Sequence, residues 1–312
     1  MLVTVSLSSP IIRHYPNVTL DKCGIGRQSY KYRSTLSVNN NNHMSAKIQN
    51  GLIPAQGDWP WIVYLKSVKY LIWKFIPIKY VSCTGVILNK QWILTAAHCF
   101  RQNFKSTVRL VQDLNDNSHT YGVDKWFIHP KYRANQKGLK KLRYDVALLK
   151  LDTKLSEITD KFRTYPTING ICLPDNTNNN NKNIVINTNV DNDEWALMAG
   201  FGKIDVGVDN QGPVLRAGWT RFEYMYSLYD GVILASRYPE NVGAGSCAGD
   251  SGGPLVQYIT DGNGRDSGRA VLIGIAISID GNQCLNKSSG NYMYFARVSK
   301  LVDWIQDTVR YN

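Results

Sequence analysis

A serine flanked by glycines is the first feature of this sequence that could do chemistry. Gly249-Asp250-Ser251-Gly252-Gly253-Pro254 places one hydroxyl in a segment whose glycines allow a tight turn and leave room for a substrate chain. A serine needs a base to take its proton, and donors for the oxygen that becomes negative during acyl transfer. We expect Ser251 to be the nucleophile and the amides of Gly249 and Ser251 to be the donors. The alternative is a glycine-rich turn with an incidental serine.

Two further stretches supply a base and a carboxylate. Leu94-Thr95-Ala96-Ala97-His98-Cys99 puts His98 after an apolar, strand-like run. Tyr144-Asp145-Val146-Ala147-Leu148-Leu149-Lys150-Leu151 puts Asp145 at the start of another. The chain order His98, Asp145, Ser251 and the flanking sequences resemble the chymotrypsin/trypsin-like family of serine proteases. Other folds with the same three residues order them differently.

The resemblance runs from about Ile48 to the C-terminus and weakens between Gly202 and Gly243. It implies an all-β fold of two packed six-stranded antiparallel β-barrels with a C-terminal helix. It also implies a pro-segment over residues 1–47 and a trypsin-like peptidase domain over residues 48–312. Residues 297–309 space their apolar side chains three and four apart, which favours an amphipathic helix with one buried face.

The resemblance gives each side chain a role. Ser251 attacks the scissile carbonyl, His98 takes its proton and later passes it to the leaving amine, and Asp145 orients His98 and stabilises its cationic form. The implied activity is that of a serine endopeptidase, which hydrolyses peptide bonds through an acyl-enzyme. This chemistry needs no cofactor and no metal, and we expect neither. Ser278 is the candidate to support Asp145 from behind.

The segment Lys47-Ile48-Gln49-Asn50-Gly51 resembles the activation junction of the family. Cleavage after Lys47 would free an Ile48 ammonium that could pair with the Asp250 carboxylate inside the protein. A buried ion pair of this kind forms only where it is well satisfied, because its desolvation cost is large. Gln49 departs from the small apolar residue usual in the family. The alternative is an ordinary exposed Lys-Ile bond.

Specificity is predicted from the residues at the expected substrate pocket. Gly245 stands six residues before the nucleophile, where trypsin-like members carry an aspartate, so a substrate Arg or Lys would lack a partner there. Met293 takes a place usually held by glycine and would shorten the pocket, while Ser278, Ile279 and Asp280 stand near another wall. We predict cleavage after small or medium apolar residues and not after Arg or Lys. An Asp280 carboxylate pointing inward would restore basic specificity.

Six cysteines, an even number, fit the disulfide framework of a secreted protein, and free thiols are the alternative. The resemblance implies the pairs Cys83–Cys99, Cys247–Cys284 and Cys23–Cys172, the last of which would tether the pro-segment. The triplets that begin at Asn17 and Asn286 are glycosylation sequons, a weak signal. Residues 1–22 do not form a persuasive signal peptide, so extracellular location is inferred from the cysteines and the resemblance.

The net charge of +12 is compatible with acidic partners such as polyanions, but a soluble secreted enzyme with a basic surface is the favoured interpretation. No apolar run approaches the roughly 20 residues of a membrane-spanning helix. Residues 70–80 are aromatic and apolar with interleaved lysines. They could form a hairpin with one buried face, or grip a substrate, an inhibitor or a membrane surface.

The implied partners are protein or peptide substrates, an activating protease and protease inhibitors, and we expect no specific nucleic acid. A second function remains open, that of a catalytically weak or inactive protease-like binding protein with a closed pocket. Met293 and Gln49 favour it, whereas the complete set of His98, Asp145 and Ser251 favours the enzyme. An esterase of another fold is disfavoured by the chain order His98, Asp145, Ser251.

Overall fold

The computed structural model describes fourteen segments of the chain, and every structural statement below concerns them. They are residues 23–26, 51–55, 57–71, 76–100, 104–111, 120–135, 139–155, 168–174, 194–202, 213–225, 230–236, 245–260, 266–279 and 292–312.

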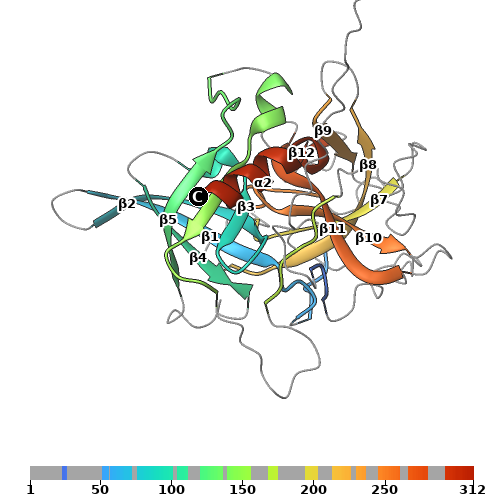
Figure 1. Ribbon diagram of the computed structural model, residues 1–312, viewed down its shortest axis with the longest axis horizontal. Helices are drawn as coiled ribbons and strands as arrows, with labels where there is room; N and C mark the ends of the chain where they lie inside the picture. The colour runs from blue at the N-terminus through green and yellow to red at the C-terminus, as the bar shows by residue number, and fades with distance from the viewer. Residues whose placement is uncertain are drawn as a thin grey trace, which may run out of the picture.

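Six antiparallel strands close the first barrel in the order β1-β2-β3-β6-β5-β4 (Figure 1). They are β1 (Ile62–Leu71), β2 (Ile76–Ile87), β3 (Trp92–Thr95), β4 (Phe104–Leu110), β5 (Tyr121–Ile128) and β6 (Ala147–Leu151). Strand β3 is buried along its whole length, and β6 is buried at every residue but one. That burial explains why their sequences read as continuous apolar runs rather than as an alternation of apolar and polar residues.

The second barrel repeats the architecture with the order β10-β11-β12-β9-β8-β7. Its strands are β7 (Glu194–Gly200), β8 (Arg216–Tyr224), β9 (Val232–Ser236), β10 (Pro254–Thr260), β11 (Asp266–Ile279) and β12 (Tyr292–Arg297). The predicted pair of six-stranded antiparallel barrels is therefore confirmed.

The C-terminal helix is also confirmed, but it begins later than the periodicity predicts. Arg297 still belongs to the sheet, because its amide donates to the Gly231 carbonyl. A 3₁₀ turn, η5 (Val298–Lys300), then leads into α2 (Val302–Tyr311). The helix buries Val302 and Ile305, and Figure 1 shows it in front of the barrels. Within the described residues, no helix is long and apolar enough to cross a membrane.

Disulfides join segments that are distant in sequence. The structure contains Cys83–Cys99 and Cys23–Cys172, both implied by the resemblance. Cys247 is also disulfide-bonded, and its predicted partner Cys284 lies outside the described residues. Closing a loop of this kind restricts the unfolded chain and typically stabilises a fold by about 2–4 kcal/mol.

Candidate active site

The register between two strands brings the predicted base and carboxylate together. Strands β3 and β6 are antiparallel, and Thr95 at the end of β3 lies opposite Ala147 at the start of β6. The residues that follow β3 and those that precede β6 therefore meet at one end of the barrel. His98 lies there in the short turn η1 (Ala97–Cys99), and Asp145 lies two residues before β6.

Asp145 holds His98 through two hydrogen bonds. The carboxylate oxygen Oδ2 lies 2.8 Å from Nδ1 of the imidazole, and Oδ1 accepts a hydrogen bond of 2.8 Å from the His98 backbone amide. Asp145 is only 1% exposed, whereas the His98 side chain is 31% exposed. An imidazole that donates from Nδ1 to a carboxylate keeps its Nε2 as the acceptor. The pair is thus arranged to take a proton on the exposed side of the ring.

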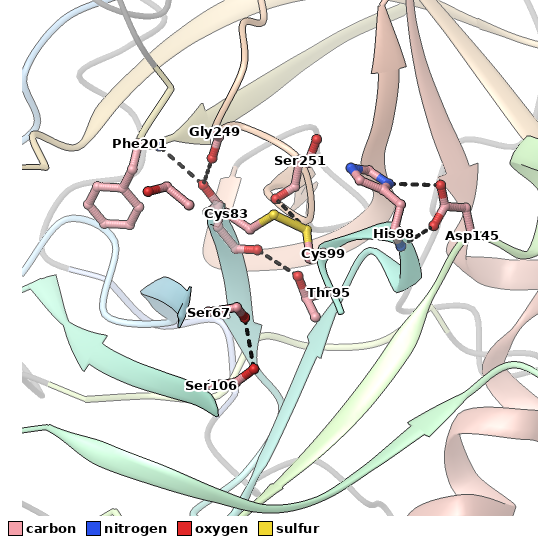
Figure 2. Close-up of a disulfide and its surroundings, with 12 residues drawn as sticks. Ser67, Cys83, Thr95, His98, Cys99, Ser106, Asp145, Phe201, Gly249 and Ser251 are labelled. Carbon is pink, nitrogen blue, oxygen red and sulfur yellow. Dashed lines mark hydrogen bonds and ion pairs between the residues drawn. A yellow bond between two sulfur atoms is a disulfide. The ribbon is translucent and has the colours of Figure 1, made fainter. Parts of the chain in front are cut away.

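Ser251 lies beside that free side of the imidazole. Figure 2 shows it on the side of the His98 ring opposite Asp145. Two backbone hydrogen bonds hold the segment that carries Ser251. The Thr84 amide donates to the Ser251 carbonyl at 2.8 Å, and the Gly252 amide donates to the Ala276 carbonyl at 2.7 Å. Gly252 adopts φ +83°, and a Cβ there would come within 2.0 Å of the Thr95 hydroxyl oxygen. Only glycine fits this position, which accounts for the residue that follows the serine.

The two predicted donor amides are not used elsewhere. Among the described residues, neither the Gly249 nor the Ser251 amide donates a hydrogen bond to the protein. Gly249 adopts φ +104°, where a Cβ would lie 3.1 Å from Gly202. The loop backbone is therefore turned in a way that glycine favours, and it leaves both N–H groups available for a ligand.

Thr84 is a positioning residue that the sequence reasoning missed. It is fully buried in β2. Its hydroxyl donates to the Gly249 carbonyl at 3.0 Å and accepts from the Phe201 amide at 3.1 Å. Its own carbonyl accepts from the Thr95 hydroxyl at 2.7 Å. A threonine within a strand gives no sequence signal of this role, although its place directly after Cys83 could have drawn attention to it.

Asp250, beside the nucleophile, is completely buried with its carboxylate turned into the protein. Its two oxygens accept hydrogen bonds of 2.7 Å from the backbone amides of Gly202 and Cys247. Burial raises the pKa of the carboxyl to about 6, although the two amide bonds oppose that rise. No cation pairs with it among the described residues, and Lys47 and Ile48 lie outside them.

Comparison with known proteins identifies the family of the chain. The family model described as Trypsin matches residues 48–305. The chain belongs to the trypsin family. The resemblance read from the sequence is thereby confirmed.

The curated relatives of this trypsin-family chain include coagulation factor XI of Bos taurus and serine proteinase stubble of Drosophila melanogaster. The first is 29% identical over 224 residues, which cover 68% of this chain. The second is 29% identical over 283 residues, which cover 85% of it. Both alignments span only 31% of the relative. The clotting factor G beta subunit of Tachypleus tridentatus is 28% identical, with 84% of this chain and 79% of that protein covered.

A solved structure titled HL collagenase shares the fold. It superposes with a TM-score of 0.58 at 22% identity and covers 84% of this chain and 99% of that one.

The predicted pocket of this trypsin-family chain holds a methionine. Met293 in β12 is 1% exposed, and its sulfur accepts a hydrogen bond of 3.1 Å from the Ser246 amide. Gly245 is buried beside it, and Ser278 is exposed near the end of β11. The backbone of Ile279 pairs with Met293. Asp280 lies outside the described residues, as do the sequon residues Asn17 and Asn286.

One cluster within the described residues has donor atoms close enough to hold a metal, namely Cys83, His98 and Cys99. Both cysteines are joined in a disulfide, and a metal would need them as thiolates. The disulfide therefore leaves this cluster without the thiolates that a metal would need.

Proposed function

We propose that the chain is a serine endopeptidase with Ser251 as nucleophile, His98 as general base and Asp145 as the residue that orients it. The observation that carries the proposal is the double hydrogen bond between Asp145 and His98, with Ser251 beside the opposite edge of the imidazole. In this geometry, Nε2 takes the hydroxyl proton as Oγ attacks a peptide carbonyl. The same proton then goes to the leaving amine, and water releases the acyl group by the reverse path.

The amides of Gly249 and Ser251 form the oxyanion hole of the proposed enzyme. Their N–H groups make no other hydrogen bond among the described residues. Loss of one donor of this kind typically costs about a hundredfold or more in turnover. Thr84 supports them, because its hydroxyl holds the Gly249 carbonyl.

Activation is proposed to follow cleavage after Lys47, with residues 1–47 as the pro-segment and residues 48–312 as the peptidase domain. The new Ile48 ammonium would pair with Asp250. What supports this is the fully buried Asp250 carboxylate, whose pKa is raised by burial and which has no cation beside it among the described residues. The disulfide Cys23–Cys172 would keep the pro-segment attached after cleavage.

Specificity is proposed to be for small or medium apolar side chains. Met293 lies against the segment that contains Gly245 and Ser246, so the pocket is short and has no carboxylate at Gly245. A binding protein without strong catalysis is the second candidate, and the buried Met293 is the observation that favours it.

The chain is further proposed to be secreted, with protein substrates, an activating protease and protein inhibitors as its partners. The two disulfides support an oxidising compartment. The names of two relatives, a coagulation factor and a clotting factor subunit, describe proteins that act in clotting.

Peptide-library hydrolysis by the chain cleaved after Lys47 tests the proposal. Asp145→Asn should lower kcat by about ten-thousandfold, the loss characteristic of this triad, with the fold intact.

Cleavage should follow residues no larger than leucine, and Met293→Gly should extend the preference to aromatic residues. Met198→Ala is the matched control, because Met198 is buried in the same cluster. A profile dominated by Arg or Lys would refute the pocket assignment, and undiminished hydrolysis by Asp145→Asn would refute the mechanism.

A further inference from the structure

The outer half of the β1–β2 hairpin is exposed from end to end. We call it the hairpin tip and define it as residues Lys69–Leu71 of β1 and Ile76–Tyr80 of β2, all of which are exposed. Its end projects beyond the barrel (Figure 1). The tip carries five of the ten exposed large hydrophobic residues of the described chain, namely Tyr70, Leu71, Ile76, Ile78 and Tyr80. A sheet with one buried face, the simpler expectation from the sequence, is therefore wrong for this half.

Apolar side chains project from both faces of the tip. Leu71 lies opposite Ile76, and Tyr70 lies opposite Pro77. Because successive residues of a strand point to opposite faces, Leu71 and Ile76 share one face, while Tyr70 and Pro77 lie on the other. Ile78 lies at an irregularity of the register, between the pairs Tyr70–Pro77 and Lys69–Lys79. A groove on a protein partner would cover one face of such a hairpin. A fluid apolar medium can surround both.

Lysines lie behind the apolar end. Lys69 and Lys79 face each other across the strands. Lys66 lies three residues closer to the barrel than Lys69 along β1, and its ammonium is 5.8 Å from the centre of the Tyr80 ring. The distance along the strand from Leu71 to Lys69 or from Ile76 to Lys79 is about 7–10 Å at roughly 3.3 Å per residue. That matches the depth of about 5–10 Å at which interfacial segments bury their apolar side chains.

The charge of the hairpin is entirely positive. The sequence from Ile62 to Ile87 contains no Asp or Glu, and Lys105 of the neighbouring strand β4 lies opposite Val68. Apolar side chains at the end and cations at headgroup depth are complementary to a membrane with anionic lipids. We propose that the hairpin tip inserts into the interface of such a membrane and docks the protein on it.

This docking would place the active site above the membrane surface. Strand β2 runs from Ile76 in the tip to Thr84, whose amide holds the Ser251 carbonyl. The eight residue-to-residue steps from Ile76 to Thr84 span about 26 Å at roughly 3.3 Å per step. The nucleophile would therefore face protein substrates that stand a few tens of ångströms from the lipid surface.

Vesicle co-sedimentation of the full chain tests the proposal, with Ser251→Ala to prevent autolysis. The chain should bind vesicles of equal parts phosphatidylcholine and phosphatidylserine, and bind pure phosphatidylcholine much more weakly. Replacing Lys66, Lys69 and Lys79 by Gln should weaken binding about a hundredfold, since each lysine near an anionic surface contributes about fivefold. Replacing Leu71, Ile78 and Tyr80 by Ser should weaken it at least about tenfold.

Matched variants elsewhere on the surface are the controls. Tyr311→Ser removes an aromatic side chain that is 70% exposed on α2, and Lys125→Gln with Lys154→Gln removes exposed charges outside the hairpin. Both controls should bind nearly as the parent does, and unfolding curves would establish that all variants fold. Equal losses in control and hairpin variants would show a general attraction of basic surface to lipid and overturn the proposal. Hairpin variants that bind vesicles normally, but that cleave a soluble protein substrate less well when Ser251 is kept and the chain is cleaved after Lys47, would assign the tip to a protein partner and also overturn it.

Discussion

Thr84 shows how one hydroxyl can hold two parts of the proposed active site. It is buried between the barrels and contacts the Gly249 carbonyl and the Phe201 amide at the same time. A buried polar group that loses its partner keeps its desolvation cost, about 1–3 kcal/mol. The residue therefore affects both stability and the placement of the loop that carries Ser251.

Thr84→Val should lower both the free energy of unfolding and turnover. Valine has nearly the same shape, so the change removes the hydroxyl and leaves two buried backbone groups without it. We expect a loss of about 1–3 kcal/mol in urea unfolding and a decrease in kcat larger than any increase in KM. Thr107→Val is the control, since its hydroxyl bonds a carbonyl at an exposed position. Equal effects of the two substitutions would contradict the role given to Thr84.

At the scale of elements, His129 joins the end of β5 to two other parts of the fold. Its ring stacks on Tyr144, with centroids 4.6 Å apart, and packs on Trp304 of α2 at 4.8 Å. Nδ1 accepts a hydrogen bond from the Lys131 amide, so that nitrogen is unprotonated. Burial, with a smaller contribution from the Lys131 charge, lowers the pKa of His129 to about 4.

This neutral histidine should make the fold sensitive to acid. Below the ordinary pKa of 6.5, the unfolded chain binds a proton that the folded chain does not take up until about pH 4. The stabilisation is therefore complete above pH 6.5 and is lost as the pH falls from 6.5 towards 4, up to about 3 kcal/mol. His129→Phe keeps the stacking and cannot titrate. Unfolding curves between pH 4 and 7 should be flatter for the variant, and an unchanged pH dependence would show that His129 is not responsible.

At the scale of the whole molecule, Asp250 would link the N-terminus that cleavage creates at Ile48 to the second barrel. Its raised pKa has the opposite sign for stability, because the folded uncleaved chain holds a proton between the ordinary pKa of 3.8 and about 6 that the unfolded chain has released. The uncleaved chain should therefore lose this contribution as the pH rises from about 4 to 6. An Ile48 ammonium would offset that loss after cleavage.

Cleavage after Lys47 should accordingly stabilise the protein at neutral pH. We expect the gain to be largest between about pH 6, where Asp250 is charged, and about pH 8, where an α-ammonium begins to deprotonate. Unfolding of cleaved and uncleaved protein at pH 5, 7 and 9 measures it. Asp250→Asn should abolish the difference, and a gain that persists in this variant would contradict the proposed pair.

The sequence predicted the parts of the molecule that short motifs encode. His98 follows one apolar run and Asp145 precedes another. The chain order of His98, Asp145 and Ser251, together with the family resemblance, was enough to predict the two barrels. Thr84 was missed because its role depends on contacts with Gly249 and Phe201, which are more than a hundred residues away in the chain. The exposure of the hairpin tip was not predictable either, because a strand with alternating lysines is compatible with one buried face or with none.

The most direct test of the proposed enzyme is fluorophosphonate labelling of the purified chain before and after cleavage at Lys47, with Ser251→Ala as the control. We predict that label enters Ser251 after cleavage, enters little before it, and is absent from the control. No labelling of the cleaved chain, with Ile48 verified as its new N-terminus, would contradict catalysis by Ser251 and favour the binding-protein function instead.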